Sequence, residues 1–213
     1  MAFLQRRPQV SNPVNYVTVG LNKTVLLVGL GNPGAKYVDT RHNIGFTCLD
    51  SFQQANSDMS PWMEKKDLKC LFSSGQLGQA RVIAIKPTTF MNLSGEAVHA
   101  VMSFYKIPLE QVVAVYDELD VDFGHIRTRV GGGSAGHNGV KSIIETEGEE
   151  FGRIRIGIGP KPHAEMDSAD FVLQKFTKKE LEHLPALTRE VNAILSEYVY
   201  GSELLHETRS FLL

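Results

Sequence analysis

Continuous apolar runs alternate along this chain with segments in which apolar residues recur at helical spacing. Thr24–Leu30 is an apolar run that glycine and proline terminate, which is typical of a buried central strand. Val112–Tyr116 has the same character, and Arg153–Ile158 alternates isoleucine with polar residues. His125–Val130 also alternates, so we expect four strands at these places.

Apolar residues three or four positions apart predict helices over His42–Gln54, Asn92–Tyr105 and His137–Glu145. Between the first two helices, Lys69–Ser74 and Arg81–Lys86 flank two glycines and are expected to form a hairpin.

A capping box of Thr177 and Glu180 indicates the start of a C-terminal helical region. Pro185 lies inside it and is expected to break or kink the helix. The apolar stripe of this region consists of Leu181, Leu184, Leu187, Val191, Ile194 and Leu195.

Strands that interleave with helices favour an α/β fold. We expect residues 23–213 to form a single domain, a three-layer sandwich with a mixed, mainly parallel sheet flanked by helices. Residues 1–22 are polar and contain two prolines, so we expect a disordered N-terminal extension. The active site of such a fold is expected at the carboxyl ends of the strands.

Composition narrows the class of protein. Of the 213 residues, 42% are apolar, and no run reaches the roughly 18 to 20 apolar residues that span a bilayer. Cys48 and Cys70 are the only cysteines, which suits a reducing compartment. We therefore predict a cytoplasmic protein without a membrane anchor. Arg6 and Arg7, in a stretch without acidic residues, leave an organellar transit peptide as the alternative.

Two glycine motifs suggest other activities. Gly29–Gly34 matches the dinucleotide-binding pattern G-x-G-x-x-G, but an acidic residue at the end of a second strand is missing and Pro33 removes an amide donor. Gly132–Gly136 matches G-x-S-x-G, so a serine esterase using Ser134 stays open as an alternative.

Four loops that follow predicted strands carry the same kinds of polar residue. They contain histidines, carboxylates and carboxamides, and they lack a thiol and a metal-ligand spacing such as H-E-x-x-H. The loops are Asn32 to Asn43, Pro87 to Asn92, Asp117 to Asp120, and the glycine-rich stretch that ends Gly136-His137-Asn138-Gly139. Singly, each residue is more typical of a cap or a turn. Together they favour ester hydrolysis by a water molecule that an imidazole activates.

Arginines two residues apart on two predicted strands indicate a basic surface. Arg127 and Arg129 share one strand face, and so do Arg153 and Arg155. Such a cluster suits phosphate binding, although the net charge of the chain is only −2. A solvated strand face paired with nearby glutamates is the alternative.

In this order along the chain, the segments VGLGNPG, TRHNIGF, KPTTFMNLSG, DELD, GGGSAGHNG and RIRIGIG resemble bacterial-type peptidyl-tRNA hydrolases. The resemblance runs from about Lys23 to the C-terminus. It implies a monomer that needs neither cofactor nor metal and releases peptide and reusable tRNA from stalled translation.

The resemblance also assigns roles to residues. His42 would be the base that activates water, Asp117 would orient its imidazole, and Asn92 would support the oxyanion, with Met91 lining the cleft. Asn32 and Asn138 would position the substrate.

The expected partner is the acceptor stem and 3′ CCA end of peptidyl-tRNA. Tyr37 and His137 would contact the tRNA end, and Arg129 and Arg155 would hold its 5′ phosphate. A tRNA-binding protein without catalysis is a further alternative. Whether residues 167–200 act as a mobile lid is left open.

Overall fold

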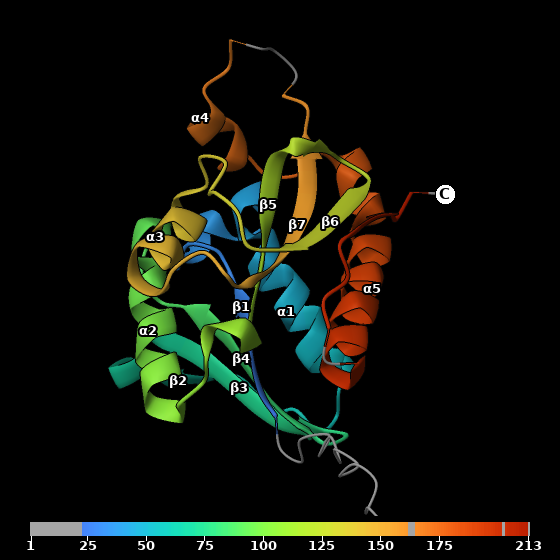
Figure 1. The fold of residues 1–213 in the computed structure, drawn as a ribbon. Helices are drawn as coiled ribbons and strands as arrows, with labels where there is room; N and C mark the ends of the chain where they lie inside the picture. Colours follow the sequence, from blue (N-terminus) through green and yellow to red (C-terminus); the bar gives the residue numbers. More distant parts are fainter. Residues whose placement is uncertain (1–22, 162–164, 202, 213) are drawn as a thin grey trace, which may run out of the picture.

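The computed structural model describes residues 23–161, 165–201 and 203–212 of the chain. The expected N-terminal extension, residues 1–22, lies outside the described residues. Within them, one sheet is covered by helices on both faces (Figure 1), so the predicted α/β sandwich with a mixed sheet is confirmed. None of the described helices is long and apolar enough to cross a membrane.

The strands are β1 (Thr24–Gly29), β2 (Met63–Lys65), β3 (Cys70–Leu77), β4 (Ala80–Pro87), β5 (Val112–Asp122), β6 (His125–Val130), β7 (Gly152–Gly159) and β8 (Glu207–Ser210). Among the described residues they form one eight-stranded sheet in the order β2-β3-β4-β1-β5-β7-β6-β8. The four central strands β4, β1, β5 and β7 are parallel, whereas both edges pair antiparallel. The predicted hairpin is the pair β3–β4.

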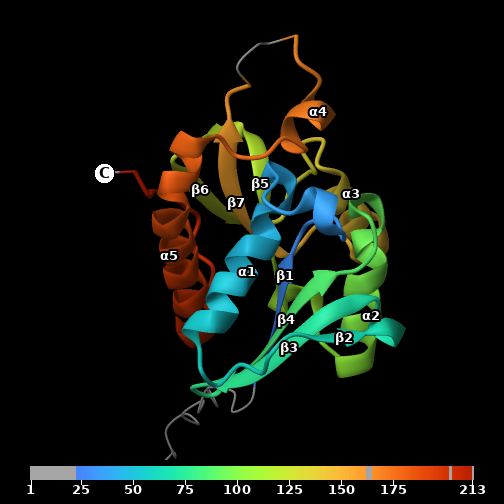
Figure 2. The ribbon, with the colours of Figure 1, turned by 180° about the vertical axis from the view of Figure 1, so that it is seen from behind.

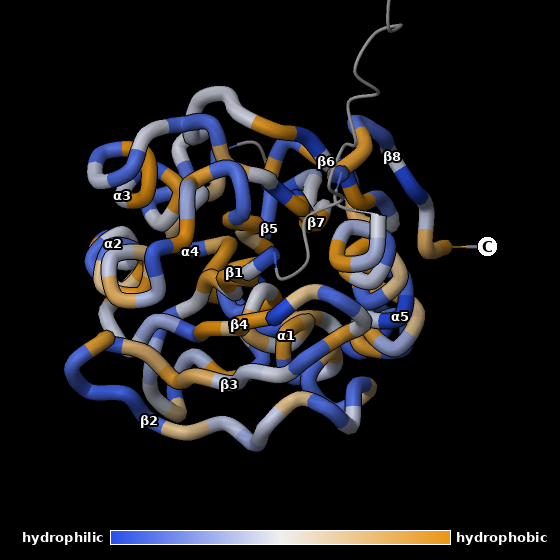
Figure 3. The backbone as a smooth tube through the Cα atoms, turned by 60° about the horizontal axis from the view of Figure 1, so that its bottom comes forward, coloured by the Kyte–Doolittle hydropathy of each residue, from blue (hydrophilic) through white to orange (hydrophobic). Residues whose placement is uncertain are grey.

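The helices are α1 (Ile44–Ala55), α2 (Ser94–Tyr105), α3 (Asn138–Glu147), α4 (Ser168–Val172) and α5 (Lys178–Gly201). Helices α1 and α5 lie on one face of the sheet and α2 and α3 on the other, as Figures 2 and 3 show from two further directions. Strand β1 packs against both layers because its side chains alternate. Val25 and Leu27 join the core under α1 and α5, while Leu26 and Val28 join the core under α2 and α3.

The C-terminal helix differs from its prediction in two ways. The helical run of α5 continues through Pro185, so the predicted break is wrong, and a kink at this residue stays a prediction. Pro185 has no amide hydrogen to donate to the carbonyl oxygen of Leu181, and both residues are exposed on the solvent side of the helix. Leu181 is 42% exposed and lies outside the core, whereas Leu187 and Val191 are fully buried.

Gly45 sets how closely α1 approaches the sheet. A Cβ atom at this position would lie 2.3 Å from the carbonyl oxygen of Val115 and 2.6 Å from the amide nitrogen of Leu30. Both neighbours are backbone atoms, one in β5 and one in the residue that follows β1, so neither can rotate away as a side chain could. Only glycine therefore lets the first turn of α1, directly after His42, touch β1 and β5.

We expect Gly45→Ala to lower the free energy of unfolding by about 1–3 kcal/mol, because the added methyl group overpacks this contact. Urea unfolding measures the effect. Gly201→Ala is the control, since a Cβ atom there meets no other atom within 4 Å. Equal stability of the two variants would contradict the close-packing role of Gly45.

Candidate active site

The carboxyl ends of β1, β4 and β5 open onto one cleft with a volume of about 600 Å³. The chain segments that follow β1 and β4, together with the second half of β5, contribute polar side chains to it. Helix α4 forms a further wall. Of the predicted site residues, those that line the cleft are Asn32, His42, Met91, Asn92, Asp117, His137 and Asn138.

Two of the four predicted loops reach the cleft in an unexpected way. Strand β5 extends to Asp122, so Asp117 lies inside a strand, opposite Ile156 of β7, instead of in a loop. Strand β6 runs antiparallel to β7 and ends beside the first residue of β7, at the opposite end of the strands from the cleft. Residues 131–137 then lead the chain back to the start of α3. Arg153 Nη1 anchors this return by donating to the carbonyl oxygen of Gly133 at 2.5 Å.

Asp117 lies between two imidazole rings at the bottom of the cleft. His42 Nδ1 is 3.0 Å from each carboxylate oxygen of Asp117, and His137 Nε2 is 3.1 Å from Oδ1. The carboxylate is only 2% exposed. The two ring centroids are 4.9 Å apart, and the buried ring of Tyr116 packs against His137.

The hydrogen bonds assign different roles to the two histidines. His137 caps α3, because its Nδ1 accepts hydrogen bonds from the amides of Gly139 and Val140. Its proton therefore resides on Nε2, which donates to Asp117. His42 donates to the same carboxylate through Nδ1, and no described residue hydrogen-bonds to His42 Nε2. Neutral His42 thus presents a basic nitrogen, whereas both nitrogens of His137 are engaged.

The buried carboxylate also controls the charge of His42. Burial lowers the pKa of His42, but the charge of Asp117 and the hydrogen bond to it outweigh burial and raise this pKa above its ordinary value. Burial would raise the pKa of Asp117, yet the two histidines hold it well below its usual range. Asp117 is therefore ionised at neutral pH and stabilises an imidazolium at His42.

A network of amides fixes Asn32. Its Oδ1 accepts a hydrogen bond from the amide of Met91 at 2.8 Å. The side chain of Asn43 forms two hydrogen bonds with the backbone of Asn32. The Asn32 amide donates to Asn43 Oδ1 at 2.9 Å, and Asn43 Nδ2 donates to the Asn32 carbonyl at 3.0 Å. Because Oδ1 of Asn32 is engaged, its NH₂ group is the end that serves the cleft. Asn92 and Asn138 add two exposed carboxamides.

One side of the cleft is apolar. Helix α4 and the end of β5 supply Val172, Leu173 and Leu119, and exposed Phe90 stands at the mouth. Tyr37 lies outside the lining residues, but its ring meets that of Phe90 edge to face at a centroid distance of 6.4 Å. The cleft therefore combines polar chemistry with a surface for apolar substituents.

The predicted arginine surface forms across β6 and β7. The strands are adjacent and place Arg127 opposite Arg155 and Arg129 opposite Arg153. Arg127 and Arg129 are exposed, whereas Arg153 is buried. Arg155 donates from Nε and Nη2 to Glu118, at 3.0 and 2.9 Å. Glu118 itself lines the cleft, so this surface adjoins the site.

Sequence reasoning missed several members of the site. Asn43 and Glu118 occur inside the motifs T-R-H-N and D-E-L-D, but their hydrogen-bond partners depend on tertiary contacts. The apolar residues of α4 carry no signal of their own. Ser134 is not among the described residues that line the cleft. The serine esterase alternative is therefore not favoured.

The donor atoms of His42, Asp117 and His137 lie within 4.8 Å of one another, close enough to hold a metal ion. In the structure these atoms hydrogen-bond to each other. A test of the reaction must therefore control for metal.

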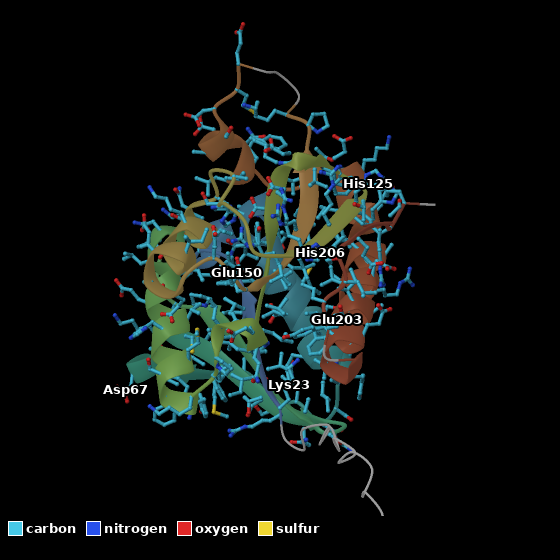
Figure 4. The ribbon with its side chains drawn as sticks, viewed as in Figure 1. Lys23, Asp67, His125, Glu150, Glu203 and His206 are labelled. Atoms are coloured by element: carbon cyan, nitrogen blue, oxygen red, sulfur yellow. The ribbon has the colours of Figure 1, made fainter. Side chains whose placement is uncertain are left out.

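A second cavity, of about 490 Å³, lies at the amino end of β7 and includes Glu150, Glu203 and His206 (Figure 4). The described residues that line it include no counterpart of the carboxylate shared by two histidines. The cleft at the carboxyl ends of the strands is the better candidate, because it gathers titratable groups with shifted pKa values and carboxamides.

Comparison with known proteins matches this chain to one family. A family model described as peptidyl-tRNA hydrolase matches residues 26–210. The chain is 49% identical over 161 residues to the chloroplastic peptidyl-tRNA hydrolase of Arabidopsis thaliana, a match that covers 75% of this chain and 54% of the relative. It is 41% identical over 180 residues to the peptidyl-tRNA hydrolase of Bartonella henselae, covering 84% and 91%.

Solved structures agree with the sequence matches. The crystal structure of peptidyl-tRNA hydrolase from Acinetobacter baumannii superposes with a TM-score of 0.78 at 32% identity, covering 84% of this chain and 89% of that one. The chain thus spans about half the length of the plant relative and about nine-tenths of the bacterial ones.

We expect Asp117→Asn to lower the pKa of His42, because the variant removes the charge that raises this pKa while the ring stays buried. An NMR titration of the imidazole measures it. Asp120→Asn is the matched control, since Asp120 lines the same cleft without contacting His42. If both substitutions shift the titration equally, the direct contact with Asp117 is not the cause.

Proposed function

Because the chain belongs to the peptidyl-tRNA hydrolase family, a family of ester hydrolases, we propose that it hydrolyses the ester between a peptide and the 3′ end of a tRNA with a water molecule that His42 activates. The observation that carries this mechanism is the basic Nε2 of His42, left unbonded by the described residues while Asp117 holds Nδ1.

The proposed reaction is a general-base hydrolysis. His42 Nε2 takes a proton from water as the water oxygen bonds to the ester carbonyl carbon. Asp117 stabilises the imidazolium that forms. The tetrahedral intermediate then expels the ribose oxygen, which receives the proton back from His42. Free peptide and tRNA result, and the histidine is neutral again.

The carboxamides are suited to the oxyanion of that intermediate. The NH₂ groups of Asn92 and Asn32 are the proposed donors, and Asn138 is proposed to orient the substrate. Donors of this kind contribute about 3–4 kcal/mol each in favourable cases, because they are fixed before the charge develops. The apolar wall of Leu119, Val172 and Leu173 is proposed to receive the peptide.

The surface of β6 and β7 is proposed to bind the tRNA. Arg129 and Arg155 are the proposed contacts to its 5′ phosphate, and Glu118 holds the guanidinium of Arg155 in place. Tyr37, beside Phe90 at the mouth of the cleft, is proposed to contact the 3′ end. A monomer in the cytoplasm stays a prediction.

The first experiment is hydrolysis of N-acetyl-aminoacyl-tRNA in the presence of EDTA. We expect the wild type and Ser134→Ala to turn over and His42→Ala to lose about 10²- to 10⁴-fold in rate, because the general base is gone. An EDTA-sensitive wild type would point to metal at His42, Asp117 and His137. A wild type that binds tRNA without turnover would favour the non-catalytic alternative.

A second experiment tests the arginine surface. We expect Arg129→Gln and Arg155→Gln to weaken tRNA binding and to reduce the salt dependence of the binding constant by about 0.7–0.9 per lost phosphate contact. Filter binding over a series of salt concentrations measures this slope. Arg189→Gln, on the exposed side of α5, is the control. An unchanged slope in both surface variants would place the tRNA elsewhere.

A further inference from the structure

Arg41 precedes His42 in the chain but turns away from the cleft. It is 3% exposed and does not belong to the residues that line the cleft. Its Nη2 donates to both carboxylate oxygens of Glu180, at 3.1 and 2.8 Å, and its Nη1 donates to the carbonyl of Lys175 at 3.0 Å. The guanidinium also lies over the rings of Phe171 and Phe176, at 4.4 and 5.5 Å from their centroids. All four partners belong to the region from α4 to the start of α5.

The backbone makes the same connection. The amide of Arg41 donates to the carbonyl of Gln174 at 3.0 Å, and Thr40 forms an antiparallel bridge with Lys175. Residues 39–41 and 174–176 therefore run side by side as a short two-stranded contact. The residues directly before His42 are thus paired with the residues that follow α4.

Glu180 connects this contact to α5. Its carboxylate accepts from the amide of Thr177 at 2.6 Å while Thr177 Oγ1 accepts from the amide of Glu180 at 3.3 Å, which is the capping box predicted from the sequence. Burial would raise the pKa of Glu180, but the bonds from Thr177 and Arg41 hold it below its ordinary value. One ionised carboxylate therefore caps α5 and binds Arg41.

We infer that Arg41 is a positioning residue that holds the base His42 and the α4 wall of the cleft in one fixed geometry. This inference rests on the proposed function, in which α4 contacts the peptide and His42 activates water. Residues Ser168, Ala169 and Val172 of α4 line the same cleft as His42. A shift of either element relative to the other changes the distance between the bound peptide and the attacking water.

The contacts at position 41 require an arginine, and another cation does not suffice. Arg41 serves a carboxylate, a carbonyl and two aromatic rings through one planar group, which the point charge of a lysine cannot do. Its Nε is buried without a hydrogen-bond partner among the described residues. This unpaired group is unfavourable for stability, whereas the other contacts of Arg41 fix the two segments relative to each other.

The test is steady-state hydrolysis of two substrates, N-acetyl-aminoacyl-tRNA and a tRNA carrying a longer peptide. For Arg41→Lys we expect kcat to fall about ten- to a hundredfold on both, since misplacement of about 1 Å has effects of this size. We expect KM to rise more for the longer peptide, which contacts more of α4. Glu180→Gln keeps the shape of the contact and is expected to change both quantities in the same direction but less.

Arg209→Lys is the matched control. Arg209 also binds glutamates, Glu190, Glu197 and Glu207, but it lies on β8, away from the cleft. We expect its kcat and KM values to equal those of the wild type. A purely structural role of Arg41 would reduce the amount of folded enzyme and leave the KM ratio of the two substrates unchanged, and that result would overturn the inference.

An NMR titration of His42 gives a readout that does not depend on turnover. We expect the pKa of His42 to fall in Arg41→Lys, because displacement of its segment lengthens the contact with Asp117. An unchanged titration together with an unchanged KM ratio overturns the inference. An inactive wild type contradicts the proposed function instead. In that case the titration alone tests whether Arg41 positions His42: a lowered pKa in Arg41→Lys supports the inference, and an unchanged pKa overturns it.

Discussion

The buried carboxylate of Asp117, shared by two imidazoles, is the interaction on which the site depends. A carboxylate this deep in a protein is unfavourable unless its charge is compensated and its oxygens are hydrogen-bonded. The two histidines provide both the compensation and the hydrogen bonds, but they differ in their other contacts. His137 is engaged by the first turn of α3, whereas no described residue hydrogen-bonds to Nε2 of His42. One carboxylate thus binds both a histidine that caps a helix and the histidine that is the proposed general base.

The fold supplies this carboxylate through the strand that carries it. Strand β5 lies in the centre of the sheet between β1 and β7, and Asp117 is held there by strand pairing on a rigid element. His42 arrives from the next layer, at a place where Gly45 lets α1 touch the sheet. His137 arrives from the opposite layer. The geometry of the candidate site is therefore set where three layers of the fold meet, on rigid elements.

Much of the fold and the composition of the site were predictable from sequence. Apolar runs located the central strands, and the polar loops contained the residues that line the cleft. The features that the sequence did not predict depend on contacts between distant segments, which no local sequence pattern specifies. Asp117 resembled a turn former after a strand, yet pairing with β7 extends that strand beyond it. The bond between Glu118 and Arg155 and the apolar wall of α4 arise only when distant segments meet.

The amide network around Asn32 has a consequence for how the free energy of the reaction is distributed. Oδ1 of this side chain is held by Met91 and its backbone by Asn43 before any substrate arrives. The rotamer freedom of the amide is lost when the chain folds, so binding does not have to restrict it again at each turnover. In the proposed reaction, folding stability thereby supplies part of the order that the transition state requires, because the amide dipole of Asn32 is oriented before the oxyanion forms.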